Sequence, residues 1–447
     1  MKLVSVRLSS GGYLTAAAIL TFASLILLRT HRDLAALIVI ASTWIAVPAL
    51  IISNRLKFDG ERLWRSGPIH ILTGLLSGAS ERIKADDISR VDVVSLRTLR
   101  RGGNVRYRYR VEISAGESFV FSSGGRNFRR MIRELFVRLP EHKLDVRARE
   151  LRDHLVDNSL LKREVARLQI APLSVLEVTS ESVSRDKRLA DRKNVPASTD
   201  DLQRANELRK LANDLRIAGR LRESAEAFRR AFLVTKPDGQ LVYEFSRLLR
   251  SQASAFSDAR MLSRARAALR LAALRGSRDA RLLEVIGESF LEFGEPGRAT
   301  RTFRMALYLD EAAYRALLGL AEVGLAEGKL AHVIHHYNEA VRVAPDKASR
   351  LMAQREADYY SRLNNDDDYL AAELRRMNWL EGADRVQRLA ARATFGAILI
   401  ALIGPSIGSV VAGVGWALAS SSIVGWASAL IVKRLLSARR RVAVGDL

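Results

Sequence analysis

Cysteine is absent from this 447-residue sequence, which excludes disulfides, thiolate metal sites and cysteine nucleophiles. A Walker-type phosphate loop is also absent, because the glycine-rich stretch 123–126 is not followed by Lys-Ser or Lys-Thr. No serine lies in a nucleophile-elbow motif. We therefore expect a protein that is not an enzyme and has no catalytic residues and no cofactor.

Acidic residues are few, 49 against 72 lysines and arginines, so the formal net charge is +23. Such an excess of positive charge suits an anionic membrane surface or a nucleic acid. The hydrophobic content of 48% is high for so charged a chain. This combination predicts apolar and basic segments that are kept apart, as in a membrane protein with basic cytoplasmic parts.

Charge is nearly missing from two apolar runs at the N-terminal end, about 10–28 and 34–53. Each run approaches the roughly 20 residues that a helix needs to cross a bilayer. Only five residues separate the runs, and lysine and arginine flank the pair. The pattern predicts a transmembrane hairpin with both ends in the cytoplasm. The alternative for the first run is a cleaved signal peptide, which the second full run disfavours.

The C-terminal stretch 394–432 contains no charged residue, and basic residues flank it on both sides. At this length it is long for one span and barely sufficient for two. We expect a tight or re-entrant helical hairpin with both ends in the cytoplasm, and a single kinked, tilted span is the alternative. Breaks are predicted at 404–408 and 420–422. Glycines that would let helices approach closely are Gly404, Gly408, Gly413, Gly415 and Gly425.

An internal repeat lies between these apolar ends, in segments that begin at Ala205, Ser246, Ala280 and Tyr314. The last three starts are 34 residues apart. One column reads Ala231, Ala272, Ala306, Ala340; a second reads Phe228, Leu269, Phe303, Tyr337; a third reads Ala212, Ala253, Gly287, Ala321; a fourth reads Gly219, Arg260, Gly294, Gly328. Small residues allow two helices to cross closely, and the large apolar column fills the space between units.

This period and these columns resemble the tetratricopeptide repeat (TPR). The resemblance covers about a third of the chain and implies a helical solenoid that binds a protein partner in its concave groove. The family's proline column survives only as Pro345, and the second unit departs from the pattern around its turn. The packing residues that the resemblance implies are Ala212, Phe228, Ala231, Ala253, Ala272, Gly287, Phe303, Ala306, Ala321, Tyr337 and Ala340.

Short alternating runs after residue 54 predict a small β-rich domain. They include a hairpin with an Asp59-Gly60 turn at 56–64, strands at 88–94, 106–114 and 118–121, and a helix at 127–138. Strands that are closed by one helix, just after a two-span hairpin, resemble the bacterial pleckstrin-homology-like (PH-like) domain. The pieces that carry this resemblance are 57–61, 83–88 and the final helix.

One strand of this domain is rich in arginine. Alternation along 105–111 places Arg106, Arg108 and Arg110 on one face, and Arg97, Arg100 and Arg101 precede them. Arginine pairs well with phosphate oxygens, so these residues are candidates for contact with anionic lipid or phosphate. The alternative is a solvated sheet face. Nucleic acid is a weaker option, because the interleaved tyrosines point to the other face.

The remaining segments predict connections and caps. Stretch 141–169 predicts one or two exposed amphipathic helices, which pack on their own domain or pair in a dimer. A flexible linker follows, and Asp200 or Asp201 is expected to cap the first repeat helix. The aspartates at 366–368 indicate a helix N-terminus rather than a metal site. His332, His335 and His336 have metal-compatible spacing, but no carboxylate or cysteine set accompanies them, so no metal is expected.

The fold class expected is therefore a multi-domain, mainly α membrane protein, with a TPR solenoid, a PH-like β domain and apolar hairpins at both ends. The expected domains are a transmembrane hairpin (1–53), a PH-like domain with a C-terminal helix (54–140), a helical connector (141–170), a flexible linker (171–200), a TPR array with capping helices (201–380) and a basic amphipathic segment with a membrane hairpin (381–447).

The expected function is that of a scaffold at the bacterial inner membrane. It spans the membrane several times, and its central domains are cytoplasmic. A protein partner in the TPR groove, anionic lipid and a second copy of the chain are the expected partners, and the wedge-like C-terminal hairpin would also shape the membrane. The alternatives are an accessory subunit of a transport or envelope-biogenesis complex and a membrane-tethered protein that binds nucleic acid.

Overall fold

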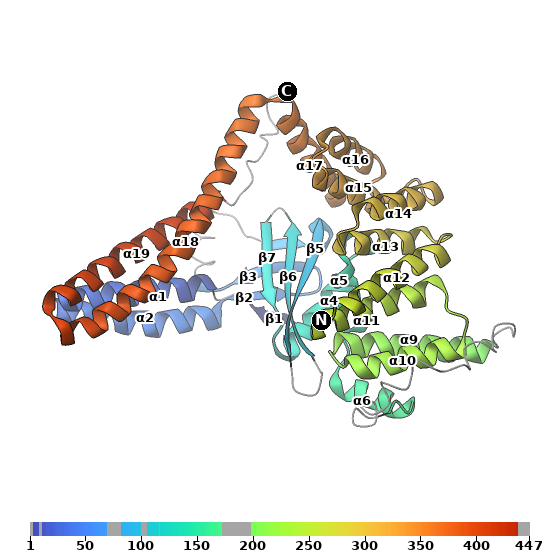
Figure 1. Ribbon diagram of the computed structural model, residues 1–447, viewed down its shortest axis with the longest axis horizontal. Helices are drawn as coiled ribbons and strands as arrows, with labels where there is room; N and C mark the ends of the chain where they lie inside the picture. Colours follow the sequence, from blue (N-terminus) through green and yellow to red (C-terminus); the bar gives the residue numbers. More distant parts are fainter. Residues whose placement is uncertain are drawn as a thin grey trace. The chain divides into compact units, whose positions relative to one another are not determined.

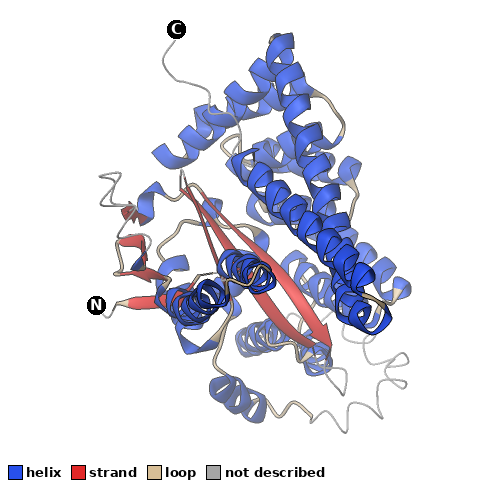
Figure 2. Ribbon diagram, turned by 90° about the vertical axis from the view of Figure 1, so that its left-hand side faces the viewer, coloured by secondary structure: helices blue, strands red, loops and turns tan. Residues whose placement is uncertain are grey.

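The computed structural model describes residues 3–8, 11–68, 82–99, 105–115, 117–171 and 198–436. In these residues the protein is mainly helical, and its strands form two small antiparallel sheets in the N-terminal part (Figures 1 and 2). The chain divides into two compact units, one from Met1–Ser9 and Ile52–Gln354, the other from Ser10–Ile51 and Arg355–Leu447. Most of the predicted linker, at 172–197, lies outside the described residues.

The first unit begins with a β domain of two sheets. The four-stranded sheet consists of β1 (Val4–Arg7), β2 (Arg55–Phe58), β3 (Arg62–Ser66) and β4 (Arg82–Lys84), and the three-stranded sheet of β5 (Arg90–Leu99), β6 (Val105–Ala115) and β7 (Glu117–Ser122). The predicted β2–β3 hairpin is present. Its turn contains Gly60 at φ 109°, and the Asp59 carboxylate accepts hydrogen bonds from the next two backbone N–H groups.

Strand β1 was not expected, because the sequence places residues 1–53 in the membrane hairpin. Val4 pairs with Phe58 and Val6 with Leu56, and all four side chains are buried. Only two alternating valines mark this strand, and so short a pattern is not distinguishable from a polar segment that leads into a helix. The chain thus contributes a strand to the β domain before it enters the first apolar helix.

Helix α4 (Gly125–Phe136) covers the β domain and closes its core. Its buried side chains Met131, Ile132, Leu135 and Phe136 lie in one cluster with Phe121 of β7. Three short elements follow: η3 (Glu141–Lys143), α5 (Val146–His154) and α6 (Asn158–Arg167). The expectation that this connector is exposed is wrong for α5, whose Val146, Ala148 and Leu151 are buried.

Four helix pairs form the array that follows (Figure 1). They are α9 (Thr199–Ile217) with α10 (Leu221–Val234), α11 (Gly239–Phe256) with α12 (Ala259–Arg275), α13 (Ala280–Glu292) with α14 (Pro296–Leu309), and α15 (Tyr314–Ala326) with α16 (Leu330–Val343). Ser198, not an aspartate, is the N-cap of α9. Its hydroxyl accepts from the backbone N–H of Asp201, whose carboxylate completes a capping box.

The small and large columns of the repeat occupy the interior of the array. The eleven packing residues that the repeat columns predict are all buried. Phe303 of α14 lies against Gly287 of α13 and Gly319 of α15, and a Cβ at either glycine would collide with its ring. Glycines 219, 294 and 328 end their helices at positive φ, as the turn requires, and in the second pair Ser257 takes this conformation at φ 55°.

The second unit contains the apolar helices of both chain ends. They are α1 (Gly11–Arg29), α2 (Asp33–Ser53), α18 (Asp367–Ile407) and α19 (Ser409–Leu436), and α17 (Lys347–Asn365) runs across the division between the units. Helices α2, α18 and α19 are long and apolar enough to span a membrane. The described apolar part of α1, Ala16–Arg29, is shorter. Asp366 caps α18 as expected.

The C-terminal apolar stretch is a hairpin that turns at Gly408, within the first predicted break, and α19 continues through the second. Gly404 faces Ala412 and Gly415 faces Ala401 so closely that a Cβ at either glycine would meet backbone atoms. Two of the five glycines thus bring α18 and α19 together as predicted. Phe22 of α1 also packs against this hairpin, with its ring centroid 6.3 Å from that of Trp416.

We predict that Gly319→Ala destabilises the array, because the added methyl group collides with the buried Phe303 ring. The expected loss is about 1–3 kcal/mol in the free energy of unfolding. Gly297→Ala is the matched control, since open space surrounds that glycine in α14. It should be neutral or stabilise by up to about 1 kcal/mol. Urea unfolding of the detergent-solubilised protein measures both, and equal effects would contradict this packing.

Candidate functional site

Helix α5 lies between the three-stranded sheet and the first helices of the array pairs (Figure 1). Its N-cap, Asp145, accepts hydrogen bonds from the backbone N–H groups of Ala148 (2.6 Å) and of Val93 in β5 (3.1 Å). The same carboxylate therefore starts the helix and fixes it to the sheet. Burial raises the pKa of Asp145 to about 6, although both backbone hydrogen bonds lower it.

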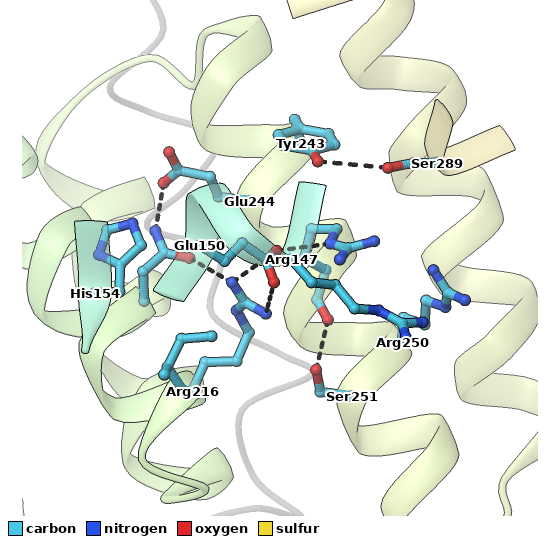
Figure 3. Close-up of polar contacts among 12 residues, drawn as sticks. Arg147, Glu150, His154, Arg216, Tyr243, Glu244, Arg250, Ser251 and Ser289 are labelled. Atoms are coloured by element: carbon cyan, nitrogen blue, oxygen red, sulfur yellow. Dashed lines mark hydrogen bonds and ion pairs between the residues drawn. The ribbon is translucent and has the colours of Figure 1, made fainter. Parts of the chain in front are cut away.

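Glu150 is the centre of the contact between α5 and the array (Figure 3). Its carboxylate pairs with Arg216 of α9 at 2.9 Å and with Arg247 of α11 at 2.8 Å. The side chains of both arginines are only 6% exposed. Burial alone would raise the pKa of Glu150, but the two guanidinium groups outweigh it and hold the pKa well below its usual range. Glu150 is thus the anion that two successive pairs share.

Further ion pairs extend this contact along the array. Arg149 of α5 pairs with Glu288 of α13 at 3.2 Å, and Glu288 also pairs with Arg315 of α15. The imidazole of His142 lies 2.5 Å from the carboxylate of Asp346, which follows α16. The β domain and its connector therefore contact the array from its first pair to its last. We name α5 and these ion pairs the domain junction.

Two hydrogen bonds join the first residues of β6 to the first turn of the array. The N–H of Val105 donates to the carbonyl of Gly219 at 3.0 Å, and the Tyr109 hydroxyl donates to the carbonyl of Ile217 at 3.1 Å. A Cβ on Gly219 would collide with the carbonyl of Val105. Glycine is therefore required at position 219 for two reasons: its φ of 80° is positive, and β6 approaches it closely.

The structure describes the side chains of three of the six sequence-predicted arginines. Arg106, Arg108 and Arg110 are exposed on one face of β6, and the register places Arg108 opposite Leu96 and Arg110 opposite Val94. The Arg97 side chain, Arg100 and Arg101 lie outside the described residues, so the predicted site of six arginines stays a prediction.

On the face of the sheet that carries these arginines, the neighbouring strand β5 contributes exposed apolar side chains. Val94 is 49% exposed and Leu96 is 60% exposed. Apolar side chains between arginines form a surface that is both basic and hydrophobic. Such a surface suits the interfacial region of an anionic bilayer, where apolar groups and cations are both favoured.

The second helices of two array pairs, α12 and α14, carry further exposed apolar side chains. Leu271 and Leu274 of α12 and Met305 and Tyr308 of α14 are exposed and occupy equivalent positions, 34 residues apart. We name these four residues the outer patch. Exposed arginines accompany it on the same two helices: Arg264, Arg275, Arg301 and Arg304.

The histidines of α16 hold no recognisable metal site. In the part of the chain that the structure describes, no group of three or more histidines, aspartates or glutamates is arranged to hold a metal ion. Burial, together with the neighbouring His335, His332 and Arg304, lowers the pKa of His336 to about 4. His332 and His335 are exposed on the surface of α16, and His336 is half-buried.

No protein-family model matches this sequence, and comparison with curated proteins found no match. The TPR and PH-like resemblances therefore stay predictions. The sequence does not reveal the domain junction, because Glu150 lies in the charged run 147–153, which is typical of an exposed helix. Arg216 and Arg247 lie within the helices of the array, and no local pattern marks them as buried.

We predict that Glu150→Gln destabilises the protein by about 3–5 kcal/mol, because the buried Arg216 loses its anion and the buried Arg247 keeps only its pair with Glu292. The folded-state pKa of Glu150 is lowered. Its ionised form therefore stabilises the fold above the unfolded-state pKa of about 4.3, and this contribution is lost as the pH falls towards the folded-state value. The difference between wild type and variant should shrink below about pH 4.

Urea unfolding of the solubilised protein between pH 3.5 and pH 7 is the measurement. Glu339→Gln is the control, because Glu339 pairs at the surface with Arg342, whose side chain is 74% exposed. It should cost less than about 1 kcal/mol. A loss for Glu150→Gln as small as that of the control would show that the domain junction does not hold the β domain and the array together.

Proposed function

We propose that this protein is a membrane-anchored scaffold that recruits a protein partner to an anionic bilayer, in the inner membrane of a bacterium. Three helices that are long and apolar enough to span a bilayer support the anchoring. The net charge of +23 supports an anionic surface. An array of helix pairs offers an extended surface for a partner, as helical repeats do in general.

The outer patch is the observation that carries the recruitment proposal. The side faced by α5 is occupied by the chain itself: Arg216, Arg247, Glu288 and Arg315 all form ion pairs in the domain junction. Partner binding is therefore assigned to the outer face of α12 and α14. Soluble proteins rarely leave contiguous large apolar side chains exposed unless something binds there.

The chemistry of the outer patch defines the partner. Tyr308 is 87% exposed and Leu274 is 75% exposed, and such side chains become the central anchors of an interface. The arginines around them favour negative charge on the other side. The partner is thus a protein segment with apolar side chains that are flanked by aspartate or glutamate.

Cross-linking in cells tests this surface. A photo-reactive amino acid in place of Tyr308 should capture one protein with an acidic, apolar segment, and the same group in place of Lys236, an exposed residue at the end of the first pair, should not. Leu274→Ser should lower the amount of cross-linked product about tenfold or more without loss of helical content, because it places a hydroxyl group at the centre of the contact. Equal capture at positions 308 and 236, or capture that survives Leu274→Ser, would refute the proposal.

The basic face of β6 is proposed to lie on the anionic bilayer. In nanodiscs with anionic lipid, amide hydrogens of β5 and β6 should exchange more slowly than in nanodiscs with zwitterionic lipid. Arg108→Gln with Arg110→Gln should abolish this difference, as should about 1 M salt, because charge attraction is then screened within about 3 Å. Arg260→Gln, an exposed arginine of α12, is the control. Protection that is independent of lipid charge would contradict contact between this face and the bilayer.

A further inference from the structure

A cavity of about 190 Å³ lies beside Glu150, among β6, α5, α9 and α11. Four arginines line it: Arg147 of α5, Arg216 of α9, and Arg247 and Arg250 of α11. Figure 3 shows Arg147, Arg216 and Arg250 around Glu150. Serine and tyrosine hydroxyl groups complete the lining, from Ser95, Tyr107, Ser251 and Ser254 among others.

Positive charge exceeds negative charge in this cavity. Two carboxylates serve the four guanidinium groups: Glu150 pairs with Arg216 and Arg247, and Glu292 pairs with Arg147, Arg247 and Arg250. Four positive charges less two negative charges leave an excess of two. Buried charge without a counter-charge is unfavourable in a medium of low polarity, so the site favours an additional anion.

The state of individual arginines agrees with this excess. The Nε of Arg216 is buried and has no hydrogen-bond partner, although this side chain is only 6% exposed. Burial, together with the neighbouring Arg247 and Arg147, lowers the pKa of Arg250 to about 9. Burial followed by the charge of Arg247 also lowers the pKa of Arg147. A bound anion would accept hydrogen bonds and offset this repulsion.

We propose that this cavity binds a small phosphate-type oxyanion, held chiefly by Arg147 and Arg250. Guanidinium groups bind phosphate through two parallel hydrogen bonds. The volume is below the roughly 300 Å³ of pockets that hold drug-sized ligands, so the site suits a phosphate group rather than a whole nucleotide. The anion would connect α5 with α11 and so strengthen the domain junction.

This proposal does not depend on the recruitment of a partner. Its ligand is either free inorganic phosphate or the phosphate of a lipid headgroup, and two probes distinguish these sources. The solubilised full-length protein is titrated with inorganic phosphate and, separately, with glycerol 3-phosphate, at constant ionic strength set with sodium chloride. Isothermal calorimetry gives the affinity, and hydrogen exchange of α5 gives the effect on the domain junction.

We expect saturable binding and slower exchange of α5 amides in the wild type. Arg250→Gln, which keeps a polar side chain without the charge, should weaken binding by about tenfold or more, because it removes charge-assisted hydrogen bonds. Arg250→Lys keeps the charge but loses the fork geometry, so its affinity should lie between the two. Arg260→Gln removes the same charge from an exposed site and should bind as the wild type does.

Comparable affinity for the two probes would identify free phosphate as the ligand, and clear preference for glycerol 3-phosphate would identify a headgroup. Either result supports the proposal if Arg250→Gln abolishes binding of the probe while circular dichroism shows an unchanged fold. Absence of saturable binding for both probes, or affinity that is equal in wild type and Arg250→Gln, would overturn it. Arg147→Gln provides an independent second variant on another helix, with a side chain that is 31% exposed and thus not needed for the core.

Discussion

The ion pairs of Glu150 with Arg216 and Arg247 are the interaction on which the first unit depends. The carboxylate comes from α5, and the guanidinium groups come from the first helices of two successive pairs. Glu150 and Arg216 are buried as partners, and Arg247 pairs with both Glu150 and Glu292, because an isolated buried charge costs several kcal/mol. The contact therefore forms as a whole or not at all, and it makes the β domain and the array one compact unit rather than two domains on a linker.

This arrangement explains where the protein can interact with others. A solenoid without the β domain would expose the charged side of its first helices. Here that side is engaged by α5, by the first residues of β6 and by the ion pairs that reach to Asp346. The surfaces that stay available are the outer patch and the basic face of β6. We propose that the outer patch binds a protein and that the basic face of β6 binds lipid. The arginine cavity would bind an anion that strengthens the contact between α5 and α11.

The apolar helices follow a different physical rule. Inside a bilayer, apolar side chains gain little by leaving lipid for protein, so close packing of small residues decides which helices associate. Gly404 and Gly415 supply this packing between α18 and α19. Phe22 and Trp416 then join α1 to the C-terminal hairpin, and a hydrogen bond from the indole N–H of Trp44 to the Thr21 hydroxyl joins α2 to α1. Helices from the two ends of the chain thus form one unit.

Patterns that repeat over many residues were predictable from the sequence. The column that contains Phe303 and the columns of small residues predicted where the array lies. Each column recurs in all four segments, so the four occurrences together are easier to recognise than a single one. The apolar stretches placed the membrane helices for the same reason. The alternation of Arg106, Arg108 and Arg110 likewise predicted the exposed face of β6.

What depends on a single contact between distant residues was decided only by the tertiary structure. Strand β1 has too few residues for a pattern, and its partner β2 lies beyond two apolar helices. Glu150 has the same neighbours in sequence as an exposed glutamate, and only the approach of α9 and α11 turns it into a buried anion. The sequence by itself determined which segments become helices, strands and apolar spans, because those depend on local periodicity. The tertiary structure decided which charges are buried together, because that depends on where folding brings them.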